Sequence, residues 1–551
     1  MKTFHLACLT ALALPLAAHA AAPVPSFSTE RVVQDIKVLA SDDYEGRAPA
    51  SAGEGKTVAY LVKQMQAAGL KPGGTVVNGT RGWTQDVPLL KSDIVGAPAL
   101  AMTVAGQRLD LAQGSEIALR AALTGQTQVD IARAPLVFVG YGVKAPERNW
   151  DDFKGVDLRG KIMVVLVNDP DFEGGEGDFG GKAMTYYGRW TYKYEEAARQ
   201  GAAGVLVVHE YAPASYGWPT VKNSNTNTMF DIVRTDPKAS HTQMEGWIQR
   251  DLADRLLRSA GTSLDAAKKL AQTRGFKPIA LTATLDARYQ VRPETIVSKN
   301  VVGLVPGRSR PNETVIYSAH WDHLGIGQPD ASGDRIYNGA LDNASGTAAL
   351  LELGRAYAKA PAPQRTVAFL AVTAEEKGLL GSEYYAANPI FPLATTVGVI
   401  NMDGPFGGGR TRDFGISGSA KLGLLDLLVA EGARQGRHYS PDPRPEAGSF
   451  YRSDHFPMAK RGVPAISYRA GQDLVNGGTT RGKALSEEYT KLRYHQPADN
   501  WDPNWDTSGV PADLALLYNT GRALADSGRW PAWSADSEFR AARDATASQR
   551  K

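Results

Sequence analysis

The chain has 551 residues, of which 43% are hydrophobic, so it can bury a large core, and we expect two domains rather than one. Its 61 basic and 58 acidic residues leave a formal net charge of +3. This near balance excludes the strong positive field that gathers nucleic acid or an anionic membrane, so no nucleic-acid partner is expected.

The first 20 residues have the pattern of a secretory signal peptide. Lys2 precedes an apolar stretch, and a small-x-small cleavage site stands at residues 18–20. We therefore expect export, to the periplasm or the medium. The single cysteine, Cys8, lies inside this segment, and His5 stands before it where a lipoprotein signal carries an aliphatic residue. A lipid membrane anchor is therefore not expected, and the mature chain would lack disulfides.

Periodicity predicts the elements that follow. Helices are expected over Ser28 to Ala40 and over Glu54 to Gly69, the second closing at a glycine. Short β-rich segments follow at 134–142, 160–169 and 201–210, with a helix predicted at 190–199. The last two strands, joined through that helix, should pair in a small mixed sheet.

These changes in composition and hydrophobic periodicity divide the chain into five parts. They are a signal peptide (1–20), a first catalytic part (21–124), a smaller β-rich inserted domain (125–289), a second catalytic part (290–530) and a polar tail (531–551). The second catalytic part alternates strands and helices, beginning with NVVGLVPG at 300–307. This pattern predicts an α/β fold, a doubly wound and mainly parallel sheet. No element is predicted for the tail.

Residues that bind metals occur in one order along the second catalytic part: His320, Asp342, Glu376, Asp403 and His495, with Glu375 directly before the third. Three β-branched runs, at 314–320, 366–372 and 396–403, end at or just before members of this set. Because ligands bind outside the carboxyl ends of parallel strands, we expect these side chains to converge. Two imidazoles and three carboxylates suit two zinc ions that share one carboxylate.

Six ordered motifs resemble the co-catalytic di-zinc aminopeptidase family, whose relatives include bacterial leucyl-type aminopeptidases and glutamate carboxypeptidases. The motifs are AHWDHLG (319–325), GALDNASG (339–346), TAEEKGLLGS (373–382), NMDG (401–404), SDHFPM (453–458) and YHQPADN (494–500). The inserted segment is similar to the protease-associated domain that several of these peptidases carry, through GYG (140–142), RGKIMVV (159–165) and AARQGAAGVLV (197–207).

The resemblance implies a zinc-dependent exopeptidase with a role for each residue of the set. Asp342 would bridge two zinc ions, with His320 and Asp403 completing one site and Glu376 and His495 the other. Glu375 would be the general base that moves a proton from water to the leaving amine.

Three further roles follow from the same resemblance. Tyr494 would donate to the developing oxyanion. Asp322 would accept the second ring N–H of His320 and so fix its tautomer, and Asp499 would do the same for His495.

Each of these residues alone has an ordinary structural explanation. A buried histidine is most often a hydrogen-bonded core residue, paired acids favour a helix N-terminus, and Asp342 would suit a helix cap. The complete set favours chemistry. Among the other histidines, His323 is interpreted as a residue that supports the ligands and His455 as a structural or pocket residue. Three are interpreted as surface residues: His209, His241 and His438.

Several functions stay open at this point. An aminopeptidase acting on peptide substrates needs acidic groups for a free α-ammonium, which Glu375 and Asp403 supply. A carboxypeptidase or dipeptidase needs arginines for a carboxylate, and Arg452 and Arg469 stand near the pocket motifs. A single-zinc glutaminyl cyclase and a metal-free receptor-like binding protein are further alternatives. The inserted domain could cover the cleft, restrict access or form contacts in a homodimer.

Overall fold

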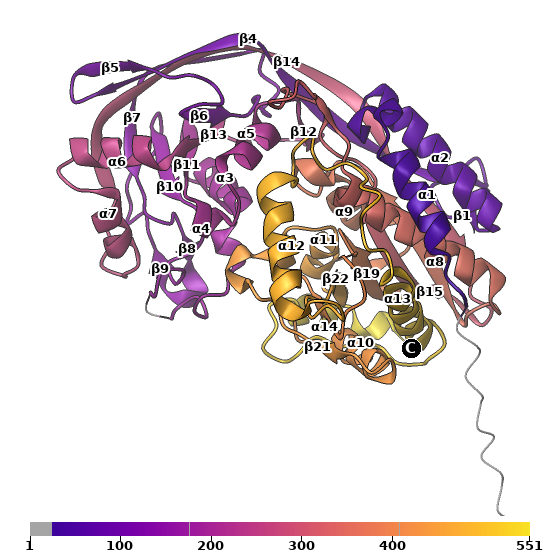
Figure 1. Cartoon of the computed structure of the whole chain (residues 1–551). Helices are drawn as coiled ribbons and strands as arrows, with labels where there is room; N and C mark the ends of the chain where they lie inside the picture. Colours follow the sequence, from indigo (N-terminus) through magenta and orange to yellow (C-terminus); the bar gives the residue numbers. More distant parts are fainter. Residues whose placement is uncertain (1–24, 176, 407, 551) are drawn as a thin grey trace, which may run out of the picture.

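The computed structural model describes residues 25–550 except 176 and 407. The expected signal peptide at 1–20 lies outside the described residues. Figure 1 shows two lobes, one built from residues near 110–280 and one from the rest of the chain. No helix within the described residues combines the length and the apolar character needed to cross a membrane.

Two capped helices open the described chain, and both confirm their predictions. Helix α1 (Thr29–Leu39) begins where the Ser28 side chain accepts a hydrogen bond from the Arg31 N–H. Helix α2 (Ala52–Ala68) ends at Gly69, which adopts the left-handed conformation with φ 86°. Glycine has no Cβ to oppose that conformation, so it terminates the helix at little cost.

The main lobe contains a mainly parallel set of strands. Strands β15 (Arg310–His320), β18 (Arg365–Val372), β19 (Thr396–Met402) and β22 (Ala465–Ala470) lie in the order β18–β15–β19–β22, all neighbours parallel. Every residue of β18 and β19 is buried, so both faces of the sheet are covered. Helices α8 (Ser345–Lys359) and α13 (Val510–Ala525) pack against it. The predicted α/β fold is confirmed.

The second lobe contains its own set of parallel strands. Strands β7 (Gln128–Phe138), β10 (Ile162–Leu166), β11 (Gly204–His209) and β13 (Met244–Gln249) are parallel neighbours in that order. Helix α3 (Trp190–Arg199) connects β10 to β11, as predicted. The buried apolar side chains of the second lobe form clusters separate from the core of the main lobe.

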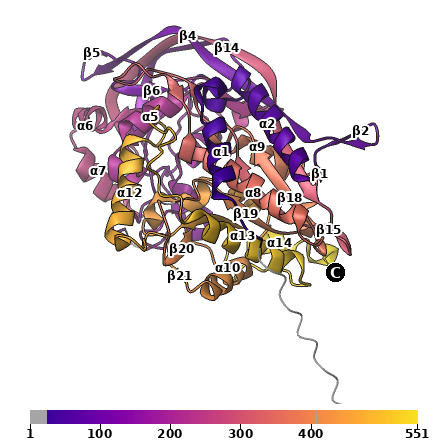
Figure 2. The same ribbon diagram turned by 45° about the vertical axis from the view of Figure 1, so that its right-hand side comes forward.

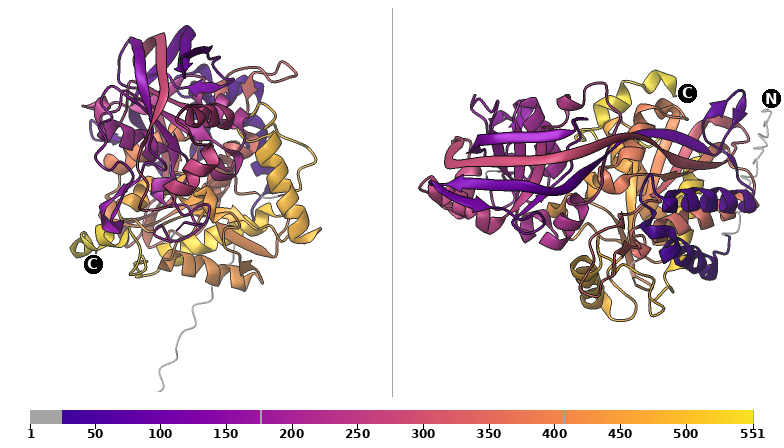
Figure 3. Two further views of the ribbon diagram at one scale, coloured as in Figure 1. Left: turned by 90° about the vertical axis from the view of Figure 1, so that its left-hand side faces the viewer. Right: turned by 90° about the horizontal axis from the view of Figure 1, so that it is seen from above.

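Two long strands join the lobes. Strands β4 (Thr84–Val104) and β14 (Ile279–Val305) are antiparallel partners, and β14 also pairs with β7 at one end and with β18 at the other. Figure 3 shows these two strands from above, running across both lobes. Figure 2 shows a separate feature, the short hairpin of β2 (Val76–Val77), which projects from the main lobe. The two lobes therefore share one continuous sheet.

The C-terminal segment, for which no element was predicted, contains helix α14 (Arg540–Asp544). Trp533 and Phe539 are buried with the main core, and Nη2 of Arg543 donates to the Thr396 carbonyl at 3.0 Å. Aromatic packing across the main lobe, which composition does not reveal, orders this polar stretch.

Candidate metal centre

The predicted ligands lie together at the carboxyl ends of three parallel strands. His320 is the last residue of β15, Asp403 directly follows β19, and Glu375 begins a short 3₁₀ turn (η6, Glu375–Lys377) just after β18. Asp342 lies in the turn before α8. The convergence expected from the strand pattern is therefore present in the structure.

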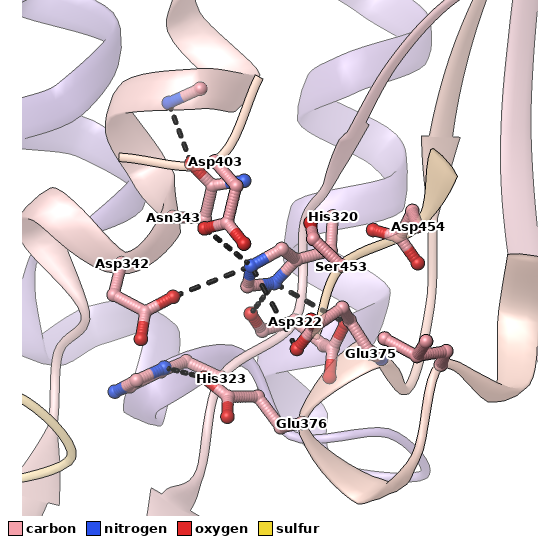
Figure 4. A network of polar contacts seen from close by, with 12 residues as sticks. His320, Asp322, His323, Asp342, Asn343, Glu375, Glu376, Asp403, Ser453 and Asp454 are labelled. Atoms are coloured by element: carbon pink, nitrogen blue, oxygen red, sulfur yellow. Dashed lines mark hydrogen bonds and ion pairs between the residues drawn. The ribbon is translucent and has the colours of Figure 1, made fainter. Parts of the chain in front are cut away.

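Asp342 is placed between two histidines. Its Oδ1 lies 3.3 Å from Nε2 of His320, and its Oδ2 lies 3.3 Å from Nε2 of His495. Nε2 of His320 also lies 3.4 Å from Asp403 Oδ1 and 4.0 Å from Glu375 Oε2 (Figure 4). Nε2 of His495 lies 3.0 Å from Glu376 Oε2. The two oxygens of one carboxylate thus face two separate ligand groups.

The candidate ligand atoms form three overlapping groups, each within 4.8 Å: His320, Asp342 and Asp403; His320, Glu375 and Glu376; His323, Asp342 and Glu376. His323, interpreted from sequence as a supporting residue, also contacts Glu376 through Nδ1 (Figure 4). The geometry therefore offers two imidazoles, those of His323 and His495, to the same pair of carboxylates.

The charge of the centre suits divalent cations. Among the described residues, the four carboxylates Asp342, Glu375, Glu376 and Asp403 form ion pairs with histidines only. Burial raises the pKa of Glu375 well above its usual value, and the charges of Asp403 and Asp454 add to this effect while His320 opposes it. Buried carboxylates without a lysine or arginine partner favour bound cations, and nitrogen and oxygen donors are those zinc prefers.

We predicted that the Asp322 carboxylate accepts the ring N–H of His320, and the structure differs. Nδ1 of His320 contacts the backbone carbonyl of Asp322 at 3.1 Å, and the carboxylate Oδ1 lies farther away, at 3.8 Å. Oδ1 instead accepts the backbone N–H of Glu375 at 3.0 Å. The main chain of Asp322 therefore orients His320, while its side chain fixes the turn that carries the two glutamates.

The prediction that Asp499 accepts the second ring N–H of His495 was wrong. Asp499 accepts the backbone N–H groups of Leu341 and Asp342, each at 3.1 Å, so it holds the loop that carries the bridging candidate. Nδ1 of His495 contacts Oγ of Ser224 at 2.8 Å. Ser224 lies in α5 (Trp218–Asn225) of the second lobe, 271 residues away in sequence, so no local pattern could have identified it.

Tyr494 lies against the centre. Its ring centroid is 3.9 Å from that of His495, and both residues line a cleft of about 830 Å³ between the lobes. Burial raises the pKa of Tyr494 well above its usual value, and the charges of Asp342 and Glu376 add to this. The phenol therefore keeps its proton and can act as a donor.

The remaining histidines differ from their predictions in two cases. His209 is buried and contacts the Tyr216 carbonyl at 2.9 Å, and His241 lies between Glu245 and Asp231, at 2.9 and 3.0 Å. Neither is a surface residue, because tertiary packing brings them partners that spacing does not suggest. His438 is exposed as predicted. His455 is fully buried outside the ligand groups, and burial lowers its pKa to about 3.

Comparisons with known proteins show what the region around the centre is similar to. Residues 300–518 match the model of Peptidase family M28. A probable zinc metalloprotease of Leptosphaeria maculans is 31% identical over 220 residues, covering 38% of this chain and 49% of that protein. Aminopeptidase NAALADL1 of Mus musculus is 34% identical over 138 residues, covering 23% of this chain and 17% of that protein.

The chain thus spans about half the length of the first of these relatives. Among solved structures, the aminopeptidase from Aneurinibacillus sp. strain AM-1 has the same fold, with a TM-score of 0.55 and 19% identity over 92% of this chain and 96% of that one. The matched residues 300–518 carry every candidate ligand, and this part of the chain is similar to peptidase family M28.

Proposed function

We propose that this protein is an exported zinc aminopeptidase that removes N-terminal residues from peptides, with two zinc ions per chain. The observation that carries the proposal is Asp342, whose two oxygens each lie 3.3 Å from a different histidine. A carboxylate in that position suits two metals held side by side. The names of the relatives, a zinc metalloprotease and two aminopeptidases, support the same class of reaction.

The residues divide between two sites. His320 and Asp403 with Asp342 would hold one ion, and Glu376 and His495 with Asp342 the other. When bound, such ions polarise a substrate carbonyl and make hydroxide available near neutral pH.

Side chains of this protein transfer the proton, stabilise the oxyanion and bind the substrate ammonium. Glu375 accepts the proton of the attacking water and donates it to the leaving amine nitrogen. It suits this role because it lies beside the candidate ligands and, among the described residues, has an ion pair with His320 alone, at 4.0 Å. Tyr494 donates its phenolic proton in a hydrogen bond to the oxygen that gains charge. Asp403, which lines the cleft, offers an oxygen to the free α-ammonium of the substrate.

The second lobe is proposed as a protease-associated domain that completes the cleft. Its helix α5 contacts the ligand histidine through Ser224 and through Asn223, whose amide donates to the His495 carbonyl at 3.1 Å. A lobe that touches a ligand in this way would both limit access and support the metal centre.

The test combines metal content with substrate preference. Zinc per chain is measured by elemental analysis, and rates are measured on aminoacyl anilides and their N-acetylated forms, before and after chelation. About two zinc ions and chelator-sensitive activity that needs a free amine are expected. One zinc ion, or equal activity on acetylated substrates, would contradict the aminopeptidase and favour the cyclase or carboxypeptidase.

Export has its own test. Expression of the full chain in a Gram-negative host, followed by fractionation and N-terminal sequencing, should yield periplasmic or secreted protein that begins at residue 21. Protein retained in the cytoplasm with residues 1–20 intact would refute export.

A further inference from the structure

A fully buried arginine near the metal centre forms no ion pair with a carboxylate among the described residues. This residue is Arg47, which ends the short turn η1 (Asp42–Arg47). Its guanidinium donates to backbone carbonyls: Nε to Trp321 at 2.8 Å, Nη1 to Leu39 and Asn338 at 2.6 Å each, and Nη2 to Gly339 at 2.9 Å. A buried cation without a paired anion is costly, so these bonds must offset a large desolvation penalty.

Two of the four carbonyls flank candidate metal ligands. Trp321 directly follows His320, and Gly339 opens the turn that carries Asp342. His320 and Asp342 approach each other to 3.3 Å. Because a guanidinium is planar and rigid, its bonds fix the backbone beside one ligand relative to the backbone beside the other. Arg47 therefore acts on the placement of both ligands without touching either side chain.

A buried amide strengthens the same connection from the opposite direction. Nδ2 of Asn338 donates to the Ala40 carbonyl at 2.8 Å and to Oδ1 of Asp42 at 2.9 Å. Arg47 reaches from the N-terminal segment to the loop before Asp342, and Asn338 reaches from that loop back to the N-terminal segment. The two side chains together bond residues 39–47 to the loop that carries the bridging candidate.

The turn that carries Arg47 has an unfavourable backbone. Glu45 and Arg47 have φ angles of 50° and 53°, in the left-handed region that residues with a Cβ rarely adopt. Between them, Gly46 packs so closely that a Cβ would collide with the carbonyls of Gly325 and Tyr337. Such a conformation persists only where surrounding contacts determine it. The bonds of the Arg47 guanidinium are contacts of this kind.

The charge of Arg47 acts on the centre as well. Burial lowers its pKa to about 10, and the charges of four carboxylates oppose this effect: Asp322, Asp499, Asp342 and Glu376. The guanidinium is therefore charged near neutral pH. By its charge alone, Arg47 would repel a metal cation bound among these carboxylates. Its bonds and its charge thus have opposite effects on metal affinity, and a measurement of affinity can separate them.

We propose that Arg47, together with Asn338, is a positioning residue of the metal centre, which holds the segments carrying His320 and Asp342 in place before a metal ion binds. This inference rests on the proposed function, because it takes the centre to bind zinc. The bonds outweigh the charge, so the loss of Arg47 weakens metal binding and does not tighten it.

Zinc affinity tests the bonds against the charge. Arg47→Met removes both, whereas Arg47→Lys keeps the charge and has three donors on one nitrogen. Competition with a chelator should show zinc binding that is weaker by about 10- to 100-fold in Arg47→Met, as for other groups that orient ligands. Arg47→Lys should lie between that variant and the wild type. Unchanged or tighter zinc binding in Arg47→Met would overturn the proposal.

Arg365→Met is the matched control. Arg365 is also fully buried and donates to the carbonyls of Leu524 and Arg529, besides its pair with Glu313. It begins β18, so it lies at the amino end of a strand whose carboxyl end faces the metal centre. Its loss should lower the melting temperature and leave zinc affinity unchanged. Equal loss of zinc affinity in Arg365→Met and Arg47→Met would refute a positioning role.

Cobalt(II) gives a readout that a loss of stability alone does not change. The visible absorption of bound cobalt depends on the arrangement of its ligands, so it is recorded for the cobalt-loaded wild type and both methionine variants. The spectrum should change in Arg47→Met and stay the same in Arg365→Met. The same spectrum in all three proteins would also overturn the proposal.

A milder pair of variants decides the question if the Arg47 variants do not fold. Asp42 and Asp43 are both exposed, and of the two only Asp42 accepts a hydrogen bond from Asn338 within the described part of the chain. Asp42→Ala should weaken zinc binding by about 2- to 10-fold, the worth of one hydrogen bond, and Asp43→Ala should not. Equal zinc affinities in these two variants would contradict the proposal.

Metal binding is measured without any peptide, so this inference and the proposed function fail in different ways. A wild-type protein that binds zinc but cleaves no peptide, and whose affinity falls in Arg47→Met, would support the role of Arg47 and refute the aminopeptidase. An active aminopeptidase with equal zinc affinity in the wild type and Arg47→Met would refute the role of Arg47 alone. A wild-type protein that binds no metal would refute both.

Discussion

At the scale of single residues, the roles proposed for the two adjacent glutamates and Asp342 can be separated by mutation. Glu375→Ala should keep near-normal zinc content and lose about 10²- to 10⁴-fold in kcat, because a general base contributes on that order. Asp342→Ala should lose zinc as well as activity, since both ligand groups depend on it. Elemental analysis and kcat on an aminoacyl anilide distinguish the two. Near-wild-type turnover of Glu375→Ala would show that another group is the base.

The two imidazoles near Glu376 can be ranked in the same way. Both His323 and His495 contact Glu376, but only His495 also faces Asp342 within 3.3 Å. His495→Ala should therefore reduce zinc content to about one ion per chain, whereas His323→Ala should reduce affinity and retain two ions at saturation. Zinc titration with a competing chelator measures both. The reverse ranking would make His323 the ligand.

His241 should make stability depend on pH. Burial opposes its charge, but Glu245 and Asp231 outweigh burial and raise its pKa to about 9. Because the folded pKa exceeds the unfolded value, the protonated histidine stabilises the fold fully below about pH 6.5 and loses this effect as pH rises through 9. The contribution is about 3 kcal/mol. Urea unfolding at pH 6.5 and 9.5 should show a smaller pH-dependent loss in His241→Gln than in the wild type. An unchanged pH dependence would exclude this origin.

At the scale of elements, helix α5 links the second lobe to the metal centre. Ser224 contacts Nδ1 of His495, so Ser224→Ala should weaken zinc binding by about 10- to 100-fold, as the loss of groups that orient ligands does. Thr226→Val is a matched control, because within the described part of the chain the hydroxyl of Thr226, directly after α5, bonds only to the Lys222 carbonyl. Equal zinc affinities in the two variants would show that the contact does not support the ligand.

At the scale of the whole molecule, the proposed zinc ions should contribute to stability. Removing zinc leaves four carboxylates that pair only with histidines among the described residues. A ligand present at 1,000 times its Kd stabilises a fold by about 4 kcal/mol, so chelation should lower the melting temperature and added zinc should restore it. Asp342→Ala should show a much smaller chelator effect. An unchanged wild-type melting temperature after verified zinc loss would contradict this prediction.

Much of the architecture was accessible from sequence because its signals are local. Strand runs ending at His320 and Asp403, the glycine that stops α2 and the helix between β10 and β11 all depend on residues close in the chain. The convergence of the ligands followed from them, since parallel strands bring their carboxyl ends to one edge.

The tertiary structure alone decided which groups surround those ligands. Ser224 on His495 and the carboxylates around His241 join segments of the chain that no periodicity connects. Asp322 shows the same limit at short range, because its backbone, and not its side chain, contacts His320. Residue types and spacing determine which side chains lie at the carboxyl edge of the parallel sheet. Burial, direction and partners depend on how separate lobes pack, and that is a property of the folded chain.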